Sequence, residues 1–126
     1  MVKQVIVMRK DLNMRKGKLV AQGSHACMKV FLDRAYHDVN GAMNIPLSSA
    51  MQAWVRGEFK KITVYVNSEA ELDELYAKAV SDCIPCAMIV DNGHTEFNGV
   101  PTKTCIAIGP EYSTIIDRIT GNLPLL

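Results

Sequence analysis

Features that the sequence lacks limit where the protein can work. No stretch approaches the roughly 18 consecutive apolar residues that a membrane-spanning helix needs. Only a short apolar run, Val5 to Met8, separates Lys3 from Arg9, and this run is too short for the core of a secretory signal. We therefore expect a cytoplasmic protein without membrane contact, in which the four cysteines are reduced thiols.

Acidic residues are scarce in the first quarter of the chain. Residues 1–30 contain seven Lys or Arg and a single acid, Asp11, whereas residues 31–126 contain seven Lys or Arg and twelve acids. The formal net charge of +1 hides this segregation. A local positive field attracts a polyanion such as RNA even when the whole chain is nearly neutral. A basic face that is only solvated remains an alternative.

Complete signatures of several other chemistries are also missing. Leu19 follows Gly17-Lys18 where the phosphate loop of ATPases needs Ser or Thr. Cys83 and Cys86 have the spacing of a redox pair, but they precede and enter a predicted strand instead of starting a helix. A zinc site would need a second close-spaced pair of ligands. We expect buried, inert cysteines and a protein that uses no metal and no cofactor.

Hydrophobic periodicity and turn residues predict one α/β domain over residues 1–126. The predicted strands are residues 3–8, 61–66, 85–90 and 104–108. The predicted helices are residues 18–35, a short helix capped by Ser48 or Ser49, residues 68–80, and a last helix that starts at Pro110 and ends at Gly121, while residues 36–47 are a predicted loop.

Strands that alternate with helices favour a mainly parallel sheet. The last two strands have no helix between them and could pair antiparallel, which would make the sheet mixed. Gly23, inside the first helix, indicates a close approach by another helix or a ligand, or is neutral.

Polar residues follow two of these strands, at Lys10 to His25 and at Asp91 to Thr95. If strands 3–8 and 85–90 are parallel, both clusters lie at the same edge of the sheet, where open α/β sheets bind ligands. This arrangement predicts a functional site. The alternative is that the two clusters are ordinary polar turns.

Three motifs resemble the type-2 peptidyl-tRNA hydrolases, the archaeal and eukaryotic class, over almost the whole chain. They are Gly17-Lys18-x-x-x-Gln22-x-Ser24-His25-Ala26, Asp91-x-Gly93-x-Thr95, and Thr104-x-Ile-x-Ile-Gly109-Pro110 followed by Asp117-x-x-Thr120-Gly121. The resemblance implies a three-layer α/β/α sandwich around a four-stranded mixed β-sheet, and a homodimer. It also implies hydrolysis of the ester that joins a peptide, or an N-blocked amino acid, to the 3′ ribose of tRNA.

The resemblance implicates Lys18, Asp91, Thr95 and Thr104 in the activity and implies that Gln22 and His25 line the same site; this chain keeps all six residues. The alternative for Gln22 and His25 is a polar helix flank that makes structural hydrogen bonds. Ester hydrolysis needs an activated water and stabilisation of an oxyanion. Asp91, with Thr95 nearby, is the candidate to orient or deprotonate that water. Lys18 could stabilise the oxyanion or hold the terminal phosphate of tRNA.

Other features leave choices open. One extra residue lies between Thr95 and Thr104 relative to the family pattern, so Thr102 is an alternative site threonine. Lys10, Arg15 and Lys16 are expected to contact tRNA phosphates without base specificity. Residues 36–50 are longer than is usual in the family. The alternative functions are a catalytically silent module that binds RNA or protein, and a hydrolase of smaller esters or amides.

Overall fold

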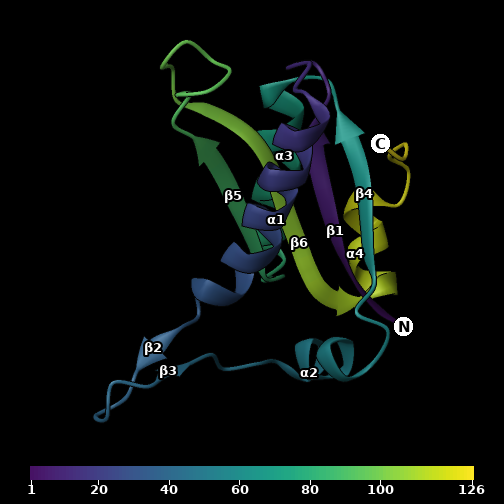
Figure 1. The fold of residues 1–126 in the computed structure, drawn as a ribbon. Helices are drawn as coiled ribbons and strands as arrows, with labels where there is room; N and C mark the ends of the chain where they lie inside the picture. The colour runs from purple at the N-terminus through teal and green to yellow at the C-terminus, as the bar shows by residue number, and fades with distance from the viewer.

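A computed structural model describes the whole chain, residues 1–126. The elements are β1 (Val2–Arg9), α1 (Lys16–Leu32), β2 (Tyr36–His37), β3 (Met43–Asn44), α2 (Ser49–Arg56), β4 (Lys61–Val66), α3 (Glu69–Ser81), β5 (Cys86–Asp91), β6 (Thr102–Tyr112) and α4 (Ser113–Thr120). Four strands form one sheet in the order β4-β1-β6-β5, and β2 and β3 form a separate hairpin (Figure 1). None of the helices has both the length and the apolar character needed to cross a membrane.

The main sheet is mixed. β1 runs parallel to β4, while β6 runs antiparallel to both of its neighbours, β1 and β5. The expected antiparallel pairing of residues 85–90 with 104–108 is confirmed. Three of the four strands, β4, β1 and β5, run in the same direction, as expected; only β6, which inserts between β1 and β5 after a connection without a helix, opposes them. β1 and β5 are consequently parallel, and their carboxyl ends lie at one edge.

Helices cover both faces of the sheet, which confirms the three-layer sandwich. Alternate residues of β1 point to opposite faces: Val5 and Val7 pack in the core beneath α3 and α4, and Ile6 and Met8 pack in the core beneath α1 and α2. An alanine at Gly23 would place its Cβ 3.8 Å from Cδ1 of Ile6, an ordinary contact. Packing of α1 on the sheet therefore does not require glycine there.

β6 is longer than its sequence predicts. The prediction ends the strand at Ile108 and starts the last helix at Pro110, but β6 continues to Tyr112 and α4 begins at Ser113. Lys3 of β1 pairs with Glu111, and the register of β1 shifts between Lys3 and Val5, opposite the proline. Proline is tolerated in a strand at such an irregularity, so pairing with β1 prevails over the local break.

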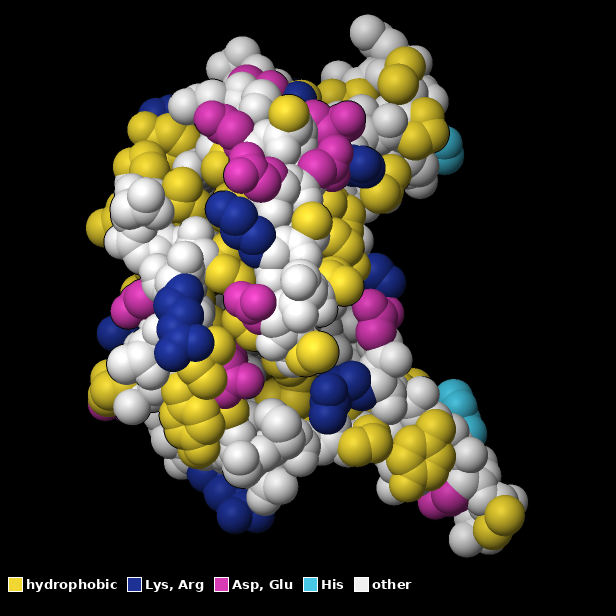
Figure 2. Space-filling view, turned by 180° about the vertical axis from the view of Figure 1, so that it is seen from behind, with side chains coloured by type: hydrophobic (Ala, Val, Ile, Leu, Met, Phe, Trp, Pro, Cys, Tyr) yellow, Lys and Arg dark blue, Asp and Glu magenta, His cyan; other side chains and the backbone are white.

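The segment predicted as a loop, residues 36–47, contains a hairpin that projects from the body (Figures 1 and 2). Asp38 closes its turn: Oδ1 accepts hydrogen bonds from the backbone N–H groups of Asn40 and Ala42, at 2.9 and 3.1 Å. Gly41 supplies the left-handed conformation that the turn needs, with φ of +80°. The segment is therefore locally ordered, although it carries no strand-like hydrophobic pattern.

Candidate active site

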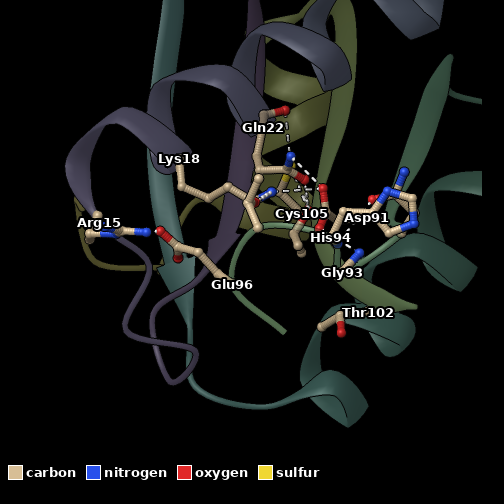
Figure 3. Close-up of polar contacts among 12 residues, drawn as sticks. Arg15, Lys18, Gln22, Asp91, Gly93, His94, Glu96, Thr102 and Cys105 are labelled. Carbon is tan, nitrogen blue, oxygen red and sulfur yellow. Dashed lines mark hydrogen bonds and ion pairs between the residues drawn. The ribbon is translucent and has the colours of Figure 1, made fainter. Parts of the chain in front are cut away.

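The two polar clusters meet at the edge formed by the carboxyl ends of β1 and β5. Lys18, in the first turn of α1, donates from Nζ to Oδ1 of Asp91 at 2.9 Å and to Oγ1 of Thr95 at 2.7 Å (Figure 3). Asp91 ends β5, and Thr95 lies in the loop that follows it. The side chains of Lys18 and Asp91 are only 13% and 12% exposed, so the pair is largely shielded from water.

Two buried side chains extend this network beneath the surface. Gln22, one helical turn after Lys18, donates from Nε2 to Oδ1 of Asp91 at 3.2 Å. Thr104 of β6 donates from Oγ1 to Oε1 of Gln22 at 2.5 Å. Because the hydroxyl of Thr104 engages the oxygen of the Gln22 amide, the amide NH₂ group is directed at Asp91. A continuous chain of hydrogen bonds therefore joins β6, α1 and β5.

The turn after β5 holds the second carboxylate oxygen of Asp91. The backbone N–H of Gly93 donates to Oδ2 of Asp91 at 2.9 Å. Gly93 has φ of +82°, and a Cβ at this position would lie 2.4 Å from the carbonyl oxygen of Val100. No other residue fits there, which gives a physical reason for the glycine of the Asp91-x-Gly93-x-Thr95 motif.

The environment of Asp91 keeps its carboxyl group ionised. The hydrogen bond from Lys18 lowers the pKa of Asp91 most; burial opposes this shift, and the Gly93 N–H, the charge of Lys18 and the Gln22 amide lower the pKa further. A carboxylate with a lowered pKa is a poor proton acceptor near neutral pH. The arrangement is therefore suited to hold an ammonium group and a water molecule in place.

Not every residue that the sequence suggests joins this network. His25 is exposed on α1 and makes no hydrogen bond with the other side chains named above. The hydroxyl of Thr102 donates to the carbonyl oxygen of Val100 at 2.8 Å, so Thr104, and not Thr102, contacts Gln22. A catalytic role for His25 remains a prediction.

The three basic residues suggested for phosphate contacts lie around the same edge. Lys16 is exposed and has no acidic partner, and Nζ of Lys10 lies 4.4 Å above the centre of the Tyr65 ring. Arg15 immediately precedes α1 and forms an ion pair with Glu96. No side chain caps α1 and no acid lies in its first turn, so the positive pole of the helix adds to these charges.

Two contacts at the site were not predicted from the sequence. The thiol of Cys105 donates to the backbone carbonyl of Gln22 at 3.3 Å, and burial raises the pKa of Cys105 to about 12, so the thiol keeps its proton. Glu96 pairs with Arg15. Their sequence neighbours, Thr104 and Thr95, were the only indication that these two residues could lie at the site.

A family model and three known proteins with similar sequences carry the same name. A family model described as Peptidyl-tRNA hydrolase PTH2 matches residues 2–126. A protein named peptidyl-tRNA hydrolase from Methanocaldococcus jannaschii is 46% identical over 125 residues, which cover 99% of this chain and 100% of that protein. Proteins of the same name from Haloquadratum walsbyi and Methanopyrus kandleri are 42% and 40% identical, over 98% and 100% of this chain and 99% of each relative.

Proposed function

The chain belongs to the peptidyl-tRNA hydrolase PTH2 family, and on this premise we propose that the network around Lys18 and Asp91 is its catalytic site. This membership confirms the resemblance seen in the sequence motifs and gives no support to a catalytically silent module. The reaction is hydrolysis of the ester between a peptide, or an N-blocked amino acid, and the 3′ ribose of tRNA. The observation that carries the proposal is the Lys18 ammonium group, fixed between Asp91 and Thr95.

The geometry supports separate roles for Lys18, Asp91 and Thr95 in the reaction. Water adds to the ester carbonyl and gives a tetrahedral intermediate with a negative oxygen. The intermediate then collapses and breaks the bond to the 3′ oxygen of the ribose, and the proton that the water loses ends on this oxygen, which leaves as a hydroxyl. Lys18 supplies the positive charge that stabilises the developing oxyanion. Asp91, whose pKa is lowered chiefly by Lys18, orients Lys18 and the water and does not act as a strong base. Because Lys18 donates to Thr95, the hydroxyl hydrogen of Thr95 is free to bond water or the leaving oxygen.

Lys10, Arg15 and Lys16 contact phosphates of the tRNA in this proposal. Arg15 and Lys16 lie at the amino terminus of α1, whose uncapped positive pole also favours an anion, and Lys10 directly follows β1. Contacts of this kind position the backbone of a nucleic acid and do not read its bases. Binding is then sensitive to salt but not to the sequence of the tRNA.

A homodimer is the second part of the proposal. Apolar side chains on the outer sides of α1, α2 and the turn that follows α2 are exposed, among them Val20, Met28, Val55 and Phe59. They border two apolar grooves of about 470 and 300 Å³, both of which Cys27 and Met28 line. A contiguous apolar surface of this kind marks a protein interface. We assign it to a second copy of the chain.

We also place the protein in the cytoplasm, where ribosomes produce peptidyl-tRNA. All four cysteines are free, in agreement with a reducing compartment.

Release of labelled N-acetyl-amino acid from tRNA by purified protein tests the catalytic proposal. The wild-type protein should hydrolyse this ester, and Lys18→Met and Asp91→Asn should each lower kcat about 100-fold or more, the usual effect of removing an oxyanion partner. Lys29→Met is the matched control, because Lys29 lies on the same helix but pairs with Asp33. An inactive wild-type protein, or full activity in both site variants, would overturn the assignment.

A further inference from the structure

Three consecutive residues of the loop after β5 contact the start of α1. Glu96 accepts a hydrogen bond from Nε of Arg15 at 2.8 Å (Figure 3). Thr95 accepts one from Lys18, and the Phe97 ring centre lies 5.8 Å from Nζ of Lys18. Glu96 therefore brings a negative charge to the part of the site where the proposed function places tRNA phosphates.

The two side chains of the Arg15–Glu96 ion pair differ strongly in their exposure to solvent. The side chain of Arg15 is 81% exposed, whereas that of Glu96 is 14% exposed. Glu96 is thus held by the protein, while Arg15 reaches outward and uses only Nε in the pair. A guanidinium group binds carboxylate and phosphate oxygens with the same donors, so a phosphate that approaches Arg15 meets a carboxylate already in place.

We propose that Glu96 competes with a tRNA phosphate for Arg15 and thereby limits the affinity of the enzyme for tRNA. The inference rests on the proposed function, which supplies the polyanionic ligand. Among Lys10, Arg15 and Lys16, only Arg15 has an acidic partner, so the competition acts at one defined contact. Deacylated tRNA, the product, carries the same phosphates as the substrate. The competing carboxylate therefore favours release of the product.

Binding of fluorescently labelled deacylated tRNA, followed by anisotropy, tests this role without turnover. Glu96→Gln keeps the shape of the side chain and removes its charge. This variant should bind deacylated tRNA about two- to fivefold more tightly than wild type at low salt, the size expected for an ion pair with one solvent-exposed partner. The gain should shrink at high salt.

Two further variants separate this role from a general effect of charge. In an Arg15→Ala background, Glu96→Gln should change the affinity no more than the control Glu58→Gln, which removes an exposed acid in the turn between α2 and β4. A gain of equal size without Arg15, or unchanged or weaker binding in Glu96→Gln, would overturn the inference. Absence of hydrolysis in the wild type would instead overturn the proposed function, so the two failures are distinguishable.

Thermal unfolding shows whether the Glu96→Gln protein is folded. If it is not, the single variants Arg15→Ala and Lys16→Ala decide the question. Because Glu96 competes for Arg15, Arg15 contributes less than Lys16 to the affinity for tRNA. Lys16→Ala should therefore weaken binding of deacylated tRNA more than Arg15→Ala. The reverse order would contradict the inference.

Discussion

At the residue scale, the site depends on hydrogen bonds that fix one another's direction. The hydroxyl of Thr104 orients the Gln22 amide, which in turn donates to Asp91. Thr104→Val keeps the shape of the side chain but leaves Oε1 of Gln22 buried and without a donor, at a cost of about 1–3 kcal/mol in stability. We expect kcat for peptidyl-tRNA to fall about tenfold or more, because the partner of Asp91 is no longer fixed.

Thr102→Val is the matched control for this experiment. Its hydroxyl donates to Val100 outside the network, so kcat should stay close to that of the wild type. Steady-state kinetics and thermal unfolding of both variants distinguish the two threonines. A larger loss of kcat in Thr102→Val would show that the wrong threonine has been placed in the site.

The charge of Asp91 leads to a second prediction at this scale, which concerns how stability depends on pH. Its pKa in the folded protein is lowered, chiefly by the hydrogen bond from Lys18. A carboxyl group of this kind contributes stability that is present above its unfolded pKa, about 3.9, and is lost as the pH falls through its folded pKa. The difference in free energy of unfolding between wild type and Asp91→Asn should therefore be largest near neutral pH and shrink below about pH 4. Urea unfolding at several pH values measures it, and a difference that grows on acidification would contradict the assignment.

Much of the site could be predicted at the residue level, and the reasons for the rest are physical. The prediction that the strands at residues 3–8 and 85–90 are parallel placed the Lys18 and Asp91 clusters at one edge of the sheet, and the two side chains are in contact. The choice between Thr102 and Thr104 depended on the pairing of β5 with β6, whose register shifts between Ile89 and Val90. A shift of this kind cannot be seen in the spacing of residues.

At the scale of single elements, α3 shows how local signals set a helix start. Ser68 accepts a hydrogen bond from the Glu71 N–H at 3.1 Å, and the Glu71 side chain accepts one from the Asn67 N–H at 2.7 Å. Ser68→Ala should lower the free energy of unfolding by about 1 kcal/mol, the usual cost of losing an N-cap. Ser81→Ala, at the other end of α3, is the control and should change stability by less than about 0.5 kcal/mol. Equal effects in chemical denaturation would argue against the cap.

Elements with strong local signals have the limits that the sequence predicts, and elements that depend on distant contacts do not. Residues 61–66 alternate apolar and polar side chains between clear boundaries, and β4 has the predicted limits. β6 exceeded its prediction because pairing with β1 carries it past Pro110. The hairpin at residues 36–47 was missed because Asp38 organises it through side-chain contacts to the backbone, which hydrophobic periodicity does not detect.

At the scale of the whole molecule, the sheet links the two hydrophobic cores. β1 and β6 contribute residues to both, since Val7 and Ile106 lie in one core and Met8 and Cys105 in the other. Loss of either core would expose one face of the same strands. We therefore predict that residues 1–126 unfold as one unit, in a single cooperative transition.

Dimerisation adds a dependence on protein concentration to this transition. Association of folded copies stabilises them by mass action, so the Tm of the wild type should rise as its concentration increases. Val55→Glu places a charge on the exposed apolar surface and should remove that dependence, whereas Val80→Glu, an exposed valine on α3 at the opposite face, should retain it. Scanning calorimetry over a tenfold or larger range of concentration, together with sedimentation, measures both effects. A concentration-independent Tm with a monomeric mass would contradict the dimer, and two separate transitions would contradict the single unit.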